Sequence, residues 1–217
     1  METDDGNLTV YRCFFGNCKS KKGSAILAHA WSASITSTAF VLCESQEYPA
    51  FFCGCMPFSS NTLNSSAFCR LSKGSLCFAL YEGQQFIHNI NSSKWIIPGE
   101  GAGFVLNNPC QGSISNILIA GGGPCQCLVL GISTSQAPPI QSLYIANATS
   151  AYAIVSYSKL VINKLYVSRL DNKNSVIGQV EIFGGNFVPY CFDVQGSADI
   201  KPNQHVEDII SNIPKKL

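Results

Sequence analysis

The sequence predicts an all-β fold: an antiparallel β-sandwich or barrel of many short strands, with a short C-terminal helix. Turn-forming Gly, Pro, Asn and Asp residues recur along the chain at short intervals, which is typical of a chain with many short strands. Between these turns, apolar and polar residues alternate with a period of two, as in a strand that buries one face. Because a sandwich and a barrel produce the same alternation, both architectures remain open at this point.

The composition predicts one folded domain. Hydrophobic residues make up 46% of the 217 residues and charged residues only 12%, whereas about 25% is usual for charged residues. Such a chain can fill a sizeable core and presents a polar, uncharged surface. We therefore expect a single β-rich domain over residues 1–217, with a candidate sub-boundary or sheet corner at Pro138-Pro139.

In the first half of the chain, Leu8 and Val10 are expected to share the buried face of a strand. Residues 24–33 are rich in alanine and carry apolar residues at helical spacing, so they form a candidate helix. Residues 75–81 alternate well enough to predict a strand. Another strand is predicted where three residues share one face, namely Phe86, His88 and Ile90.

In the second half, residues 160–170 are β-branched and aromatic enough to predict one strand or a bent pair of strands. Residues 171–175 are expected to form a hairpin loop to a half-buried strand at 176–182. The C-terminal helix is predicted over residues 203–214, because Asn203 can cap it and Pro214 ends it. Its apolar positions recur at i, i+3, i+4 and i+7: Val206, Ile209, Ile210 and Ile213.

No internal repeat stands out, and several classes of function are disfavoured. The net charge of +1 gives no electrostatic drive for binding nucleic acid. The chain lacks the roughly 18 uninterrupted apolar residues of a transmembrane helix, so no membrane insertion is expected. The acidic start, residues 1–5, does not resemble a signal peptide. This predicts a cytosolic protein, or a virion-surface protein if the chain is viral.

Eleven cysteines are the most unusual feature of the composition. The close pairs Cys53-x-Cys55 and Cys125-x-Cys127 do not have the C-x2-C spacing of zinc sites. Two cysteines in such a pair lie about 7 Å apart on one face of a strand, so each is expected to bond elsewhere rather than to its neighbour. Most of the cysteines are therefore predicted to be reduced core or loop residues, with a partial disulfide set as the alternative.

No cofactor or metal is expected. The three histidines have no metal-ligand spacing, and the glycine-rich run at 98–103 lacks the Lys-Ser/Thr ending of a phosphate-binding loop. The same run, with the aromatic residue just before it, is the candidate binding rim, because turn-proximal Trp residues are common at recognition surfaces. The candidate binding residues are Trp95, Gly99 and Gly101.

One cysteine lies in a setting that suggests catalysis. Cys125 follows the glycine-rich turn at 121–124 and precedes an apolar stretch. In this respect the segment resembles the nucleophile region of chymotrypsin-like viral cysteine proteases. The resemblance implies a Cys125 nucleophile, His29 as its base and an orienting acid such as Glu82, with a turn that could form an oxyanion hole. This protease is the alternative hypothesis for function.

The first hypothesis is a non-enzymatic β-rich recognition domain. Low charge, polar side chains and many short strands are typical of exposed binding domains, including the capsid projections and spikes of RNA viruses. The expected partner is a receptor protein or a glycan, and the expected assembly is a homo-oligomer.

Overall fold

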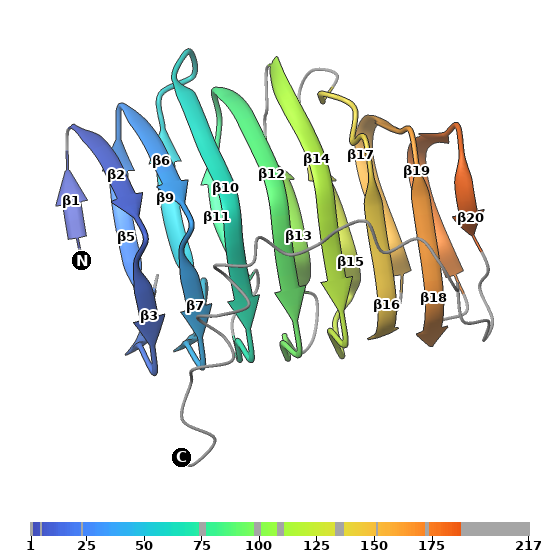
Figure 1. Ribbon diagram of the computed structural model, residues 1–217, viewed down its shortest axis with the longest axis horizontal. Coiled ribbons are helices and arrows are strands. Elements are labelled where there is room, and N and C mark those ends of the chain that lie inside the picture. The colour runs from blue at the N-terminus through green and yellow to red at the C-terminus, as the bar shows by residue number, and fades with distance from the viewer. Residues whose placement is uncertain are drawn as a thin grey trace.

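The chain folds as a parallel β-solenoid of about six turns (Figure 1). The computed structural model describes residues 2–4, 6–22, 24–73, 77–97, 101–107, 111–132, 137–150, 152–171 and 174–187. Every strand pairing among these residues is parallel. The all-β prediction is confirmed, but the antiparallel sandwich or barrel is wrong.

Two long ladders of strands run along the solenoid. One ladder contains, in spatial order, β1 (Glu2–Asp4), β5 (Ile26–Ala30), β9 (Phe51–Cys55), β11 (Ala79–Tyr81), β13 (Ala102–Asn107), β15 (Cys127–Ile132), β17 (Tyr152–Ile162) and β19 (Asn174–Ile182). The other contains β2 (Asn7–Tyr11), β6 (Ser32–Thr36), β10 (Ser60–Cys69), β12 (Gln84–Ser93), β14 (Gln111–Ala120), β16 (Leu143–Thr149), β18 (Leu165–Asp171) and β20 (Gly185–Phe187).

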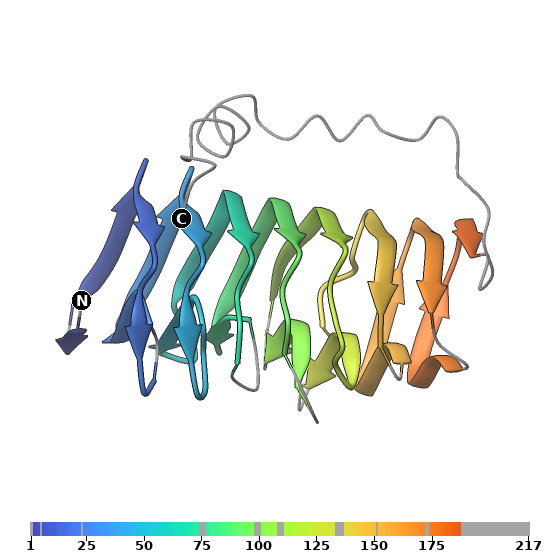
Figure 2. The same cartoon turned by 90° about the horizontal axis from the view of Figure 1, so that it is seen from below.

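Four short strands complete the first coils. These are β3 (Phe14–Gly16), β4 (Lys19–Ser20), β7 (Ala39–Val41) and β8 (Glu44–Ser45). β3 pairs with β7, which also pairs with β10, and β4 pairs with β8. Figure 2 shows successive coils stacked side by side along the long axis, with the two ladders forming opposite walls.

The strand pairings reveal an internal repeat that the sequence does not display. Each strand of a ladder pairs with the equivalent strand of the next coil, as β6 does with β10 and β18 does with β20. The stretch of chain between paired residues is longer for Ser34 and Thr62 than for Leu165 and Gly185. Because the coil length changes from turn to turn, no fixed period appears in the sequence, although each coil stacks directly on the previous one.

A continuous column of aliphatic side chains explains why the coils stay in register. Each member lies opposite the equivalent residue of the next coil, and burying such a column supplies a large part of the hydrophobic stabilisation. The column consists of Val10, Ile35, Leu63, Ile87, Ile114, Ile140, Ile162 and Ile182. All but the last are buried.

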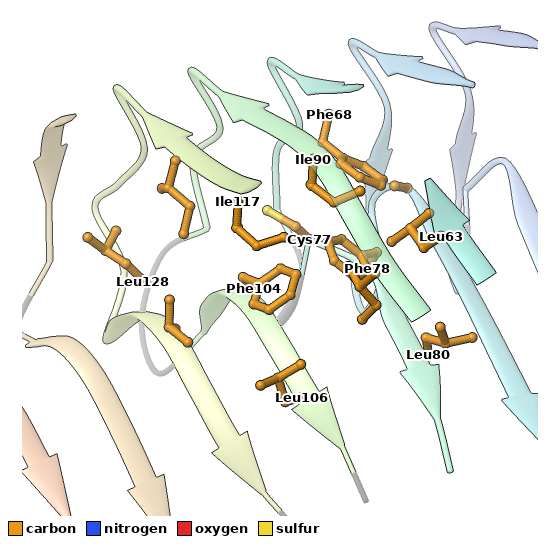
Figure 3. Close-up of a cluster of buried hydrophobic side chains, with 14 of the residues drawn as sticks. Leu63, Phe68, Cys77, Phe78, Leu80, Ile90, Phe104, Leu106, Ile117 and Leu128 are labelled. Carbon is orange, nitrogen blue, oxygen red and sulfur yellow. The ribbon is translucent and has the colours of Figure 1, made fainter. Parts of the chain in front are cut away.

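Stacked aromatic rings fill the first coils. The Phe15 and Phe40 ring centroids lie 5.1 Å apart, and those of Phe40 and Phe68 lie 5.2 Å apart. From the opposite wall, the Phe78 ring stacks on Phe68 at 4.7 Å, and the Phe104 ring meets Phe78 edge-on at 5.6 Å (Figure 3). Such pairs add about 0.5–1.5 kcal/mol each beyond the area that they bury.

The wall that carries β10, β12 and β14 bends at residues with left-handed backbone conformation. Two columns of such residues run along the solenoid. One column holds Arg12, Ser37, Ser65, Asn89 and Asn116; the other holds Asn17, Leu42, Arg70, Lys94, Gly121 and Asn147. The first bend changes which side chains point inward, so Ile90 is buried although Phe86 and His88 lie on the outer surface. The prediction that these three residues share one face is therefore wrong.

Several local predictions are confirmed and others are wrong. Leu8 and Val10 are buried together, and residues 160–170 form the bent pair of strands β17 and β18. The candidate helix at 24–33 is instead β5 and the start of β6, because its apolar residues fit the period of a strand facing the core. The expected hairpin is wrong, since β18 pairs with β16 and β20 whereas β19 pairs with β17.

The candidate helix at 203–214 lies outside the described residues. At Pro138-Pro139 the solenoid continues, with Ile140 bridging Ile114 and Ile162 in the neighbouring coils. No helix in the described part of the chain is both long and apolar enough to cross a membrane.

Candidate functional site

A pocket of about 300 Å³ opens at the ends of β5, β9 and β11. The parallel register places His29 beside Gly54, and Gly54 beside Tyr81, on three successive coils. Because the middle residue has no side chain, a hollow remains between the other two. A methyl group at Gly54 would come within 3.1 Å of His29 Nδ1, so the glycine keeps the pocket open.

Aromatic rings form the floor of this pocket. The Phe52 ring lies 5.5 Å from the His29 ring and 5.3 Å from the Tyr81 ring, between centroids. The Tyr48 ring also packs against Phe52, with 4.9 Å between centroids. Burial raises the pKa of Tyr48, and its contact with Tyr81 raises it further, so this phenol stays protonated at neutral pH. The floor therefore offers an uncharged, mainly apolar surface.

Two large exposed apolar side chains line the mouth of the pocket, and a third follows them closely in the chain. Trp31 and Met56 follow the paired residues Ala30 and Cys55, which places them on adjacent coils at the pocket mouth. Trp31 is 59% exposed and Met56 is 55% exposed. Phe58, just beyond Met56 in the chain, is 94% exposed. We call Trp31, Met56 and Phe58 the apolar rim.

The lining of the pocket includes the imidazole of His29 and the carboxylate of Glu82. The backbone at Glu82 is left-handed, with φ of 62°, and its carbonyl accepts a 3.1 Å hydrogen bond from Asn61 Nδ2. Asn61 is completely buried, so this bond anchors the corner that carries Glu82. The pocket thus combines a mostly apolar lining with one carboxylate and one imidazole.

Two thiols lie at the inner side of the same pocket. Cys53 Sγ and Cys55 Sγ are 3.5 Å apart, and Cys55 lines the pocket. The hydrogen bond between them lowers the pKa of Cys53 and, together with burial, raises that of Cys55. The expectation that strand geometry holds the two side chains well apart is therefore wrong, because their rotamers lean toward each other.

The residues predicted to form a binding rim lie elsewhere. Trp95 is completely buried, and its ring packs over Gly103 and Gly122. Gly101 is buried as well, and its carbonyl accepts a 3.0 Å hydrogen bond from the Gln126 N–H. Gly99 lies outside the described residues. The structure therefore places Trp95 and Gly101 inside the solenoid, away from the apolar rim.

The residues of the protease hypothesis are separated. His29 and Glu82 both line the pocket. Cys125 begins the coil of β15, which lies four strands along the ladder from the strand of His29 and two from the strand that precedes Glu82, roughly 19 Å and 10 Å at about 4.8 Å per strand. The parallel solenoid also differs from the two antiparallel barrels of chymotrypsin-like enzymes.

Cys125 itself is a core thiol. It is 6% exposed, and its Sγ donates to the Cys127 carbonyl at 3.2 Å. Burial raises the pKa of Cys125 to about 12, with a further contribution from Cys127. The thiolate needed for nucleophilic attack is consequently scarce at neutral pH.

The outer face of the bent wall carries a polar cluster that the sequence patterns do not reveal. His88 Nδ1 lies 2.7 Å from Ser115 Oγ, and His88 Nε2 lies 3.0 Å from Ser113 Oγ. Burial lowers the pKa of His88, which favours the neutral ring between two hydroxyls. Only the register of β12 against β14 brings these residues together.

Among the residues that the structure describes, no group of three or more His, Cys, Asp or Glu side chains could hold a metal ion. Comparison of the chain with family models, with curated proteins and with solved structures found no match.

Proposed function

We propose that this chain is a non-enzymatic recognition domain that binds a partner protein through the apolar rim and the pocket beside it. The observation that carries the proposal is a set of three strongly exposed apolar side chains: Trp31 and Met56 line a preformed hollow, and Phe58 lies two residues beyond Met56 in the chain. Aromatic residues and methionine are enriched at protein interfaces, and a few such residues usually carry most of the binding energy.

The rigidity of the scaffold supports this role. The pocket is built on the ends of three strands that are hydrogen-bonded to one another in one ladder. Binding therefore does not require ordering of the pocket backbone, and less free energy is lost on association. The lining favours an apolar side chain of the partner, with Glu82 and His29 available for hydrogen bonds at the edge.

A glycan is the other class of partner that the sequence suggests. A sugar would use Trp31 as a stacking platform, with the carboxylate of Glu82 as a hydrogen-bond acceptor. Met56 and Phe58 favour a protein instead, because these two side chains add apolar area without adding polar groups.

A peptide-display selection against the folded chain tests the proposal. We expect enriched peptides to carry an aromatic or aliphatic anchor and to bind at least about tenfold more weakly to Trp31→Ala or Phe58→Ala, as is typical for interface hot spots. Tyr157→Ala is the matched control, since Tyr157 is 74% exposed on a distant coil. Binding would be measured by calorimetry after circular dichroism has shown that each variant is folded.

Two results would contradict the proposal. One is a set of peptides whose affinity does not change in the rim variants. The other is binding of a glycan array by the wild type but not by Trp31→Ala, with no peptide ligand, which would assign the pocket to carbohydrate.

A further inference from the structure

The two thiols at the end of β9 lie closer together than a strand normally places side chains two residues apart. Cys53 Sγ and Cys55 Sγ are 3.5 Å apart, and either sulfur can be the donor in this contact. A disulfide bond is about 2.05 Å long. The two sulfurs therefore need to approach by only about 1.5 Å to form a covalent bond.

The backbone has to contract at this place to admit such a bond, because the Cβ atoms of a disulfide lie only about 3.5–4.5 Å apart. Residues two apart in a strand have Cα atoms about 6.6 Å apart, which is near the upper end of the range seen in disulfides, about 4.4–6.8 Å. Cys55 is the last residue of β9. Contraction of the strand would disturb the last pairings of β9, those of Gly54 with His29 and Tyr81 and that of Cys55 with Ala30.

An oxidant can also reach the pair. Cys53 is completely buried, but Cys55 is half-buried and lines the pocket. The contact favours the thiolate on Cys53, and transfer of the shared proton from Cys55 to Cys53 places the charge on Cys55, the sulfur that lines the pocket. Of the other described thiols, Cys77 and Cys127 are almost fully buried, whereas Cys13 and Cys18 are half-buried.

We propose that Cys53 and Cys55 form a reversible redox dithiol that a hydroperoxide, entering through the pocket, oxidises to a disulfide. The Cys55 thiolate attacks one peroxide oxygen, the O–O bond breaks, and the released hydroxide leaves as water after protonation. The Cys53 thiol then attacks the sulfenic sulfur of Cys55, the S–OH bond breaks and a second water leaves. The two thiols lose two protons and two electrons, and hydrogen peroxide is reduced to two waters.

Oxidation changes the wall of the pocket. Gly54 lies between the two cysteines and Met56 follows them, and both line the pocket. Contraction of this segment moves Gly54 relative to His29, its partner in the register of β5 against β9. The dithiol itself does not depend on the proposed binding function, and a partner that uses the pocket would sense the redox state.

Mass spectrometry after oxidation tests the inference. The folded chain is treated with hydrogen peroxide, its remaining thiols are alkylated, and it is digested with chymotrypsin, which cleaves after Phe52 and Phe58. The resulting peptide, 53–58, contains only these two cysteines. We expect it to appear about 2 Da lighter and unalkylated, with a loss of about two free thiols per chain that dithiothreitol reverses. Oxidation of Met56 adds about 16 Da and is distinguished by its mass.

Single variants provide the controls. Cys53→Ser and Cys55→Ser should each abolish the lighter peptide, whereas Cys69→Ser should leave it unchanged, because Cys69 lies in β10 away from the pocket. Folding of each variant would be checked by thermal denaturation. The inference is overturned if peptide 53–58 of the oxidised wild type stays fully alkylated, or if either cysteine is recovered in a disulfide with another thiol instead.

Discussion

At the scale of single residues, glycines decide which side chains the solenoid can hold. Gly122 and Gly103 leave room for the Trp95 ring, because a Cβ at either position would lie only 2.4 Å from a ring carbon. Gly54 in the same way leaves the hollow that forms the candidate pocket. The glycine-rich turn before Cys125 therefore has a packing role, since it accommodates the largest fully buried side chain of the described core.

Replacing Gly122 with alanine should destabilise the protein. The added Cβ would meet Trp95 Cε2 and Cζ2 at 2.4 Å, so the free energy of unfolding should fall by about 1–3 kcal/mol, as for other overpacked cores. Urea denaturation would measure this change. Gly184→Ala is the control, because its Cβ would contact only the Asn163 carbonyl at 3.2 Å.

A double-mutant cycle separates the clash from other effects of the substitution. In a Trp95→Phe background, the smaller ring should reduce the cost of Gly122→Ala. An equal cost in both backgrounds would show that Trp95 is not the group that Gly122 accommodates.

At the scale of elements, the bends between strands are made by residues that tolerate left-handed backbone to different degrees. Asn and Gly adopt this conformation readily, whereas for side chains such as Leu, Lys and Arg it costs about 1–2 kcal/mol. At one corner, Lys94 has a φ of 52°. The equivalent residue of the next coil is Gly121, whose φ is 62°. The next coil has a glycine at this corner position, whereas Lys94 adopts the same left-handed conformation with backbone strain.

Lys94→Gly should therefore stabilise the protein. Removing the strain outweighs the greater flexibility of glycine in the unfolded chain, which costs about 0.5–1 kcal/mol, so a net gain of about 0.5–1 kcal/mol is expected. The gain would appear as a higher denaturation midpoint. Lys164→Gly, at an exposed position without positive φ, should show the opposite sign. If both variants lose stability equally, strain at this corner is not significant.

At the scale of the whole molecule, the described part of each ladder ends at a strand that is paired on one side. At the last described coil, β19 pairs only with β17, and β20 pairs only with β18. Ile182, the final member of the aliphatic column, is 40% exposed, and the neighbouring Phe183 is 72% exposed. Open strand edges with exposed apolar side chains favour association with a further strand or a second molecule.

Charged substitutions at this end should weaken self-association. We expect Ile182→Lys or Phe183→Lys to shift the sedimentation profile of concentrated protein toward monomer, with a dissociation constant at least about tenfold larger. Tyr157→Lys introduces the same charge on a strand inside the ladder and should leave the profile unchanged. A monomeric wild type, or an unaltered profile in the end variants, would contradict association through this end.

The sequence by itself determined the strand content and much of the inner face. Alternation correctly predicts that Leu8 and Val10 are buried together. The β-branched and aromatic residues at 160–170 predict one strand or a bent pair of strands, and the second alternative is found. Both features depend on near neighbours in the chain. The sequence excludes neither the recognition domain nor the cysteine protease, since the polar surface and the cysteine spacings are compatible with both.

Only the tertiary structure decided the partners of each strand. Each strand pairs with the equivalent strand of an adjacent coil, and the length of chain between them varies, so alternation within a strand carries no information on parallel or antiparallel pairing. The same reason hides the pocket, whose residues come from three coils, and the His88 cluster, whose members come from two. The Cys53–Cys55 contact depends on side-chain rotamers within a single strand, which packing against the neighbouring coils selects and residue spacing does not.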